Sequence, residues 1–203
     1  MARKALPSIV LKKIKTRGRL FVVSGPSGCG KTTLCAGLLK QGLGLVRSVS
    51  ITTRKARGAE QHKKDYIYTS SADFKSQLNK GMLLEHAQVF GNHYGTPKLF
   101  IENTLKQGRG VLLNIDVQGA AQIKRKLKDA VLIFILPPSM QELKRRLLGR
   151  LTDTKAQISK RLAIAQKELK TIGRYDYYVI NDNMEDAVEE LKHIIMASRR
   201  SIL

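Results

Sequence analysis

A glycine-rich stretch between residues 25 and 32 carries the residue types that bind phosphate. It reads Gly-Pro-Ser-Gly-Cys-Gly-Lys-Thr and fits the phosphate-loop pattern G-x-x-x-x-G-K-[ST] at every required position. Glycines let successive backbone N–H groups point at phosphate oxygens, and the dipole of a following helix adds positive potential. In this pattern Lys31 reaches the β- and γ-phosphates and the Thr32 hydroxyl binds magnesium. The predicted nucleoside triphosphate site consists of Gly25, Pro26, Ser27, Gly28, Cys29, Gly30, Lys31, Thr32 and Thr33.

The segments on either side of this stretch support the prediction. Residues 20–24 form a short apolar run, which favours a buried strand. Residues 32 to about 41 favour a helix that ends at Gly42 and Gly44. Strand, loop and helix in this order distinguish a phosphate loop from a glycine-rich turn with a chance lysine.

The composition indicates one globular domain inside the cell. The chain has 203 residues, of which 42% are hydrophobic, and no apolar run approaches the roughly 20 residues that a membrane span needs. A bridge between Cys29 and Cys35 would distort the loop, so we expect reduced thiols and a cytoplasmic location. Cys29 is either a reactive thiol activated by Lys31 or, as we favour, a small packing residue.

The net charge of +21 predicts attraction to polyanions. Non-specific binding to RNA or DNA at low salt follows from it, although nucleotide substrates are anions as well. No RNA-recognition signature and no basic stretch with interleaved aromatic residues is present, so we expect no specific nucleic-acid partner. Residues 1–18 are basic and favour an N-terminal extension, with an organelle transit peptide as the alternative.

A second phosphate site is predicted between residues 50 and 60. Arg54 and Arg57 lie three residues apart after several hydroxyl residues, and the guanidinium fork binds phosphate oxygens in pairs. The alternative is an exposed basic loop. Further along, residues 65–68 favour a strand, and Ser70 or Ser71 begins a short helix that Gly81 ends.

The segment from residue 50 to residue 96 resembles guanylate kinases. The resemblance rests on Ser50, Thr52-Thr53-Arg54, Arg57, Glu60, Asp65-Tyr66, Glu85, Gly91-Asn92 and Tyr94-Gly95-Thr96, in this order after a phosphate loop. It extends over nearly all residues from about 18 onward. It implies a GMP-binding insertion over 51–96 between core segments 19–50 and 97–203. It also implies that the GMP phosphate is held by Ser50, Arg54, Arg57, Tyr66 and Tyr94, and that guanine is read by Glu85 and Thr96.

The chemistry of guanine supports that role for Glu85. Guanine presents its N1–H and N2 amino donors side by side, which match one carboxylate. Adenine presents a bare N1 acceptor there, and leaving buried acceptors unpaired costs about 1–3 kcal/mol. Glu85 is thus expected to favour guanine and to reject adenine, the alternative being a solvated acid at the surface.

Polar residues follow the apolar run 111–113. Guanylate kinases usually carry acids at both positions; Asp116 matches, whereas Asn114 departs. If the first acid holds water on magnesium, a neutral amide weakens that contact. Asp116 then serves alone, near the guanine or the metal.

Arginines on either side of a turn predict a lid over the transferred phosphate. Ser139-x-x-Glu142 is a capping box that begins a helix with Arg145, Arg146 and Arg150, and the next helix carries Arg161. The resemblance assigns Arg146, Arg150 and Arg161 to a lid at about 150–158, although Leu151 replaces a common glycine. It also places Asn181, after the strand predicted over 177–180, near the adenine of ATP.

These elements predict a three-layer α/β fold of the P-loop kinase type, with a five-stranded parallel sheet, the insertion and the lid. The resemblance implies an ATP:GMP phosphotransferase of purine nucleotide metabolism that uses ATP and Mg²⁺, with Lys31, Arg54, Arg150 and Arg161 as catalytic residues. No general base is expected, because the acceptor phosphate is already mostly ionised. The alternatives are a non-catalytic guanylate-kinase-like module that binds phosphopeptides, an RNA-binding protein and a kinase for another nucleoside monophosphate. The intact Lys31 and Thr32 favour the enzyme, and the oligomeric state stays open, a homodimer included.

Overall fold

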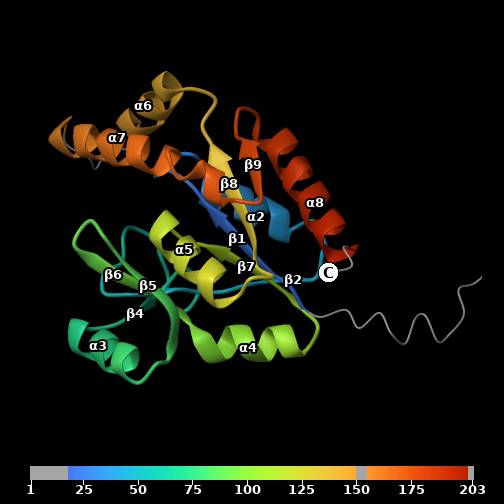
Figure 1. Ribbon diagram of the computed structural model, residues 1–203. Coiled ribbons are helices and arrows are strands. Elements are labelled where there is room, and N and C mark those ends of the chain that lie inside the picture. The colour runs from blue at the N-terminus through green and yellow to red at the C-terminus, as the bar shows by residue number, and fades with distance from the viewer. Residues whose placement is uncertain (1–17, 150–154, 201–203) are drawn as a thin grey trace, which may run out of the picture.

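The strand that leads into the phosphate loop lies in the middle of a five-stranded parallel sheet. The computed structural model describes residues 18–149 and 155–200 (Figure 1). The strand order is β2-β7-β1-β8-β9, and every neighbouring pair is parallel. The strands are β1 (Leu20–Ser24), β2 (Leu45–Arg47), β7 (Gly110–Asn114), β8 (Val131–Leu136) and β9 (Tyr177–Ile180). Because parallel strands end at the same edge, the loop after β1 and the polar end of β7 lie together there.

Helices cover both faces of this sheet (Figure 1). Phe21 and Val23 of β1 face a core that contains residues of α2 (Lys31–Leu39) and α8 (Met184–Arg200). Leu20 and Val22 face a second core with α4 (Lys98–Lys106) and α5 (Val117–Lys126). This alternation follows from the two-residue period of a strand. The predicted three-layer fold with a five-stranded parallel sheet is confirmed.

A second, smaller sheet lies between residues 51 and 97. Its order is β4-β3-β6-β5, with β3 parallel to β4 and antiparallel to β6. The strands are β3 (Ile51–Thr52), β4 (Ile67–Tyr68), β5 (Leu83–Val89) and β6 (Asn92–Pro97). Helix α3 (Ser71–Asn79) packs Phe74 against Ile51 and Leu83, and the Ser70 hydroxyl accepts the Asp73 N–H at its start. This unit therefore has an apolar core of its own.

Two antiparallel helices form a third unit near the phosphate loop. They are α6 (Met140–Leu148) and α7 (Lys155–Leu169), and a short 3₁₀ helix, η1 (Ile172–Arg174), follows them. Leu143 and Leu147 of α6 pack against Ile158 and Ala165 of α7. Of the predicted lid, Arg150 and Leu151 lie outside the described residues. Within the described ranges, no helix is both long and apolar enough to cross a membrane.

The stretch over residues 45–50 predicts a second strand, and the structure shows a shorter one. β2 ends at Arg47, although the Ser48 N–H still donates to the Leu112 carbonyl of β7 (3.1 Å). Ile51 then pairs with Gly95 in the second sheet. The chain thus leaves the first sheet after Arg47 and enters the second at Ile51, with residues 48–50 in neither strand.

Two local predictions also need correction. The strand predicted over 65–68 contains only Ile67 and Tyr68, because the Asp65 carboxylate accepts the Gln61 N–H in a turn. Only one of the two hydrogen bonds of the predicted capping box is present among the described residues. The Ser139 hydroxyl accepts the Glu142 N–H (3.0 Å), but the Glu142 carboxylate does not accept the Ser139 N–H. It pairs instead with the guanidinium groups of Arg145 and Arg146, which are stronger, charged donors.

Candidate active site

The phosphate loop is fastened to the far end of the chain by an asparagine. The Asn181 side chain donates from Nδ2 to the Cys29 carbonyl (2.7 Å). Gly30, the residue before α2, has a φ of 90°, and a Cβ at this position would collide with that Asn181 amide. Glycine is therefore required here both for its left-handed backbone and for the close approach. Asn181 positions the loop directly, through one of its backbone carbonyls.

Lys31 folds over the loop in which it sits. Its ammonium group donates to the Gly25 carbonyl (2.6 Å) and the Pro26 carbonyl (2.8 Å). Both acceptors are neutral, so a bound phosphate offers Lys31 stronger, charged acceptors at the same place. Thr33, on the same turn of α2, is exposed.

The two cysteines are free and buried. Cys29 is 0% exposed, with its sulfur 3.9 Å from the Lys31 ammonium group. Burial raises the pKa of the Cys35 thiol to about 12, so this group stays neutral and unreactive. The structure gives both residues the surroundings of packing residues.

Polar groups from β7 and α5 gather beside the start of α2. The Asn114 amide donates to the Thr32 hydroxyl (3.1 Å). Asp116 caps α5 by accepting the Gly119 N–H (2.9 Å), and it also accepts the Gln118 side-chain amide (3.1 Å). Burial raises the pKa of Asp116, and these hydrogen bonds oppose the rise. Within the described residues, no three His, Cys, Asp or Glu side chains form a metal-binding group. The oxygens of Thr32, Asn114 and Asp116 are hard ligands that suit Mg²⁺ together with water and phosphate.

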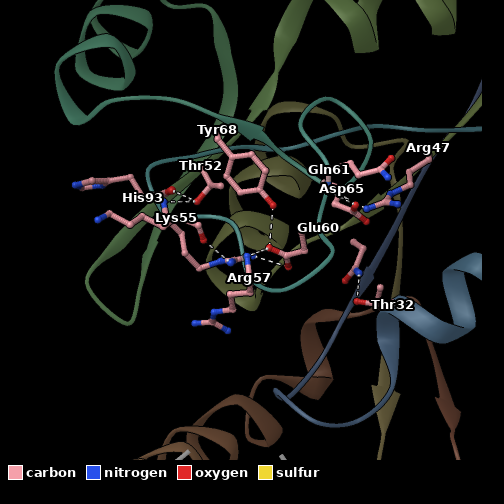
Figure 2. A network of polar contacts seen from close by, with 12 residues as sticks. Thr32, Arg47, Thr52, Lys55, Arg57, Glu60, Gln61, Asp65, Tyr68 and His93 are labelled. Carbon is pink, nitrogen blue, oxygen red and sulfur yellow. Dashed lines mark hydrogen bonds and ion pairs between the residues drawn. The ribbon is translucent and has the colours of Figure 1, made fainter. Parts of the chain in front are cut away.

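Arg54 lies in a built pocket rather than on an exposed loop. It is 8% exposed, forms an ion pair with Glu60 (2.9 Å) and lies 5.1 Å from the centre of the Tyr66 ring. Figure 2 shows the Arg57 backbone and the Tyr68 hydroxyl converging on the same Glu60 carboxylate, at 2.9 and 2.8 Å. Burial alone would raise the pKa of Glu60, but these hydrogen bonds outweigh it and lower the pKa to about 2. A permanent carboxylate therefore holds Arg54 in place.

Of the other residues predicted to hold the GMP phosphate, the two tyrosines pack beside Arg54, whereas the Arg57 and Ser50 side chains form no hydrogen bond with it within the described residues. The Tyr66 and Tyr94 rings meet edge to face, with centres 6.0 Å apart, so Arg54, Tyr66 and Tyr94 form one cluster. The Arg57 side chain is exposed, and this residue joins the network through its backbone. Ser50 is engaged in the second sheet, where its backbone carbonyl accepts the Ile67 N–H.

Glu85 and Thr96 form a buried pair between β5 and β6. The Thr96 hydroxyl donates to Glu85 Oε1 (2.6 Å), and Glu85 is 2% exposed. Burial raises the pKa of Glu85 to about 7; the Thr96 hydrogen bond opposes the rise and the nearby charge of Asp116 adds to it. A carboxylate so poorly solvated has one oxygen still available to pair with donors on a ligand.

Arg146 and Arg161, the described arginines of the predicted lid (here the lid-side arginines), contact the phosphate loop and its surroundings. Arg146 donates to the Asn181 carbonyl (3.0 Å) and to Glu142 (2.7 Å). Arg161 of α7 donates to the Ser27 hydroxyl of the phosphate loop (3.1 Å). Its guanidinium carbon also lies 4.5 Å from the centre of the Phe90 ring, in the turn between β5 and β6. The predicted site residues thus come from all three structural units.

Comparison with known proteins identifies the family. A family model described as guanylate kinase matches residues 17–198. The chain belongs to the guanylate kinase family. A guanylate kinase from Clostridium perfringens is 45% identical over 183 residues, which are 90% of this chain and 85% of the relative. One from Wolbachia pipientis wMel is 48% identical over 187 residues, or 92% and 93% of the two chains. The crystal structure of guanylate kinase from Anaplasma phagocytophilum aligns with a TM-score of 0.79 and 34% identity, covering 92% of this chain and 89% of that one.

Sequence reasoning missed two residues of this guanylate kinase site. Gly119 packs so closely on Glu85 that a Cβ on it would overlap the Glu85 Oε2 atom. A glycine in the first turn of a helix, where alanine is the better helix former, was the available signal. The second is Glu168 of α7, whose pKa burial raises to about 7 while the charge of Lys31 opposes the rise. One of its oxygens, Oε2, is buried and has no hydrogen-bond partner within the described residues.

Proposed function

We propose that this guanylate kinase family member transfers the γ-phosphoryl group of ATP to GMP and forms ADP and GDP. One observation carries the proposal: Glu85 is a buried carboxylate with a guanine-compatible partner, Thr96, hydrogen-bonded beside it. The charge of Asp116 acts on Glu85, and the charge of Lys31 acts on Asp116. Asp116 therefore links the base-binding side to the phosphate-binding side of one site.

Glu85 and Thr96 recognise the base. The two guanine donors, N1–H and the N2 amino group, pair with the Glu85 carboxylate, and Thr96 keeps that carboxylate in place. Adenine would direct its N1 lone pair at the same carboxylate, and the mismatch leaves buried polar atoms unpaired. The pair thus selects GMP by rewarding guanine and rejecting adenine.

The arginine and tyrosine cluster holds the GMP phosphate. Arg54 is fixed by Glu60 and stacked on Tyr66, so its fork is aligned before substrate binds. Tyr94 supplies a hydroxyl from the neighbouring strand, and Ser50 and Arg57 reach the phosphate from the ends of the same loop. The acceptor oxygen is already mostly ionised at neutral pH, so the reaction needs alignment and charge neutralisation rather than a general base.

The phosphate loop and the lid-side arginines hold ATP. Residues Gly25 to Thr33 surround the β- and γ-phosphates, and Arg146 and Asn181 lie beside the adenine. Lys31, Arg54, Arg150 and Arg161 neutralise the charge that develops on the transferred group. Closure of the lid near 150–158 over the insertion at 51–96 excludes water, which would otherwise hydrolyse ATP.

The Thr32 hydroxyl, with the oxygens of Asn114 and Asp116, would hold Mg²⁺. When bound, this ion neutralises and orients the β- and γ-phosphates. Asn114 contacts Thr32 at 3.1 Å, so groups from β7 and α2 already converge there. A cytoplasmic location and the absence of a specific nucleic-acid partner belong to the same proposal.

An assay of ADP release with ATP, Mg²⁺ and each of GMP, AMP, CMP and UMP tests the function. We expect kcat/KM for GMP to exceed that for AMP at least about a hundredfold, because a site built for a hydrogen-bonding group rejects analogues without it. Equal turnover of GMP and AMP would contradict the role of Glu85. No turnover with any monophosphate would exclude the enzyme and favour the non-catalytic binding module.

A further inference from the structure

A cavity lies outside the nucleotide sites, between α5 and the segment that joins α7 to β9. Its volume is about 570 Å³, within the ~300–1,000 Å³ typical of small-molecule pockets. Figure 1 shows α5 crossing the face of the sheet below α7. The cavity extends along α5 from Val117 to Arg125 and on to Lys128. Thr171, Arg174 and Tyr175 form its other wall.

The charges on its walls are positive and mostly unbalanced. Among the described residues, four cationic side chains line the cavity and no acidic side chain does: the cations are Lys124, Arg125, Lys128 and Arg174. Lys124 is neutralised by the Asp176 carboxylate at 2.8 Å. The side chains of the other three are exposed, and within residues 18–149 and 155–200 they form no hydrogen bond or ion pair. Three such cations around a hollow concentrate positive potential in it.

Three amide and hydroxyl side chains of the cavity are already engaged, while the Tyr175 hydroxyl is buried without a hydrogen-bond partner within the described residues. The Gln122 amide donates to the His86 carbonyl (2.6 Å), and the Gln118 amide donates to Asp116 (3.1 Å). The Thr171 hydroxyl donates to the Glu168 carbonyl (2.7 Å). The floor is apolar, formed by Leu132, Ala121 and the ring of Tyr175. The arginines and lysine are therefore the groups available to a ligand, and arginine forks match phosphate oxygens.

We propose that this cavity binds a small molecule that carries two or more phosphate groups. Arg125, Lys128 and Arg174 pair with the phosphates, and an uncharged part of the ligand rests on Tyr175 and Leu132. A nucleic acid strand would need a longer basic groove with several exposed aromatic rings, whereas this hollow is short and contains one half-buried tyrosine. The site is separate from the nucleotide sites and goes beyond the proposed function.

The cavity shares two elements with the active site. Helix α5 carries Asp116 at its start and Gly119 against Glu85. Tyr175 borders the cavity with its ring, and its buried hydroxyl lies beside Ser24, the last residue before the phosphate loop. A ligand in the cavity therefore contacts the supports of both substrate-binding sides.

Calorimetric titration with inorganic tripolyphosphate, at about 0.15 M salt to screen weak surface attraction, tests the proposal. The full chain is first saturated with a bisubstrate analogue, adenosine and guanosine joined through five phosphates, which fills both nucleotide sites. We expect one saturable site. The double variant Arg125→Ala/Arg174→Ala should weaken tripolyphosphate binding at least tenfold, with unchanged thermal unfolding and kinase activity.

A matched double variant, Lys40→Ala/Lys75→Ala, removes the same charge at two exposed positions, the residue that follows α2 and a residue of α3. It should alter tripolyphosphate binding less than twofold. No saturable binding, or equal losses in both double variants, would overturn the proposal. So would saturable binding of single-stranded RNA, lost in the Arg125→Ala/Arg174→Ala variant, without binding of tripolyphosphate. Kinase activity is read independently, so failure here leaves the proposed function intact.

Discussion

The guanidinium group of Arg161 lies over the Phe90 ring, 4.5 Å from its centre, while the same group donates to the Ser27 hydroxyl. This side chain joins α7, the phosphate loop and the turn between β5 and β6. An arginine at this junction can reach a phosphate that bridges the two nucleotides, and the contact with Phe90 brings the insertion to the same place. Under the proposed function, we therefore expect Arg161 to couple closure of the insertion to the charge on the transferred group.

Arg161→Ala should lower kcat for ATP and GMP by about 10²–10³, the usual effect of removing one preorganised donor to the transition state. Arg161→Lys should retain only part of the wild-type kcat, because an ammonium group cannot form two parallel hydrogen bonds. Phe90→Leu removes the ring but no charge, and should keep kcat within about fivefold, in line with the ~0.5–1 kcal/mol of an exposed cation–π contact. Steady-state kinetics measure all three. A kcat for Arg161→Ala close to wild type would remove Arg161 from the reaction.

Gly119→Ala should damage GMP binding without damaging the fold. The added methyl overlaps the Glu85 carboxylate, so we expect KM for GMP to rise at least about tenfold, as for other disturbances of buried hydrogen bonds. KM for ATP should stay within about twofold, since removal of one set of contacts leaves distant sites nearly unaffected. Gly173→Ala is the matched control, because a Cβ there meets nothing within 4 Å. If KM for GMP is unchanged in Gly119→Ala, Glu85 does not contact the base in this geometry.

Asn114→Asp should lower the Mg²⁺ concentration needed for half-maximal activity. The amide now donates to the Thr32 hydroxyl, whereas a carboxylate would accept from it and from water on the ion. Groups of this kind typically change metal affinity by about 10–100-fold, so we expect a decrease of up to about tenfold. Activity is measured across a magnesium titration at fixed ATP. An unchanged or raised requirement would contradict the placement of the ion beside Thr32 and Asn114.

Glu85→Gln should stabilise the protein without nucleotide at alkaline pH. The folded-state pKa of about 7 lies above the ordinary value of 4.5, so the folded protein loses stability as pH rises from 4.5 through 7. The variant should therefore unfold at higher denaturant at pH 8, by at most about 3 kcal/mol, and match wild type near pH 4.5. Glu190→Gln, the same change at an exposed position, should shift stability by less than about 0.5 kcal/mol. A Glu85→Gln protein that is less stable than wild type at pH 8 would contradict the burial of a charged carboxyl.

Local sequence patterns predicted the strands of the central sheet and the phosphate loop, because these elements are determined largely by residues adjacent in the sequence. The apolar run at residues 20–24 is a buried strand, and the loop between β1 and α2 follows from its glycines and lysine. The end of β2 at Arg47 and the start of β3 at Ile51 depend on strand partners that are remote in sequence. No local pattern could have shown these bounds.

For the candidate site, the residue types could be predicted from the sequence, but their contacts in the folded chain could not. Residue types that match a family pattern pointed to Arg54, Glu85 and Thr96, which the structure places in buried pockets. The contact of Asn181 with Cys29, 152 residues away, is a property of the folded chain. The same is true of Gly119 against Glu85 and of the Arg161–Phe90 contact. Packing partners decide these roles, and sequence spacing does not reveal them.

A carboxylate that reads the base is central to the proposed function, and the kcat/KM values of Glu85→Gln for GMP and AMP test this role of Glu85. A glutamine offers one acceptor and one donor, which suits the amino group and N1 of adenine better than two guanine donors. We expect kcat/KM for GMP to fall at least about a hundredfold, the effect of unpaired buried polar groups, while kcat/KM for AMP stays equal or rises. A variant that keeps its GMP activity, or loses activity toward GMP and AMP in parallel, would contradict the assignment.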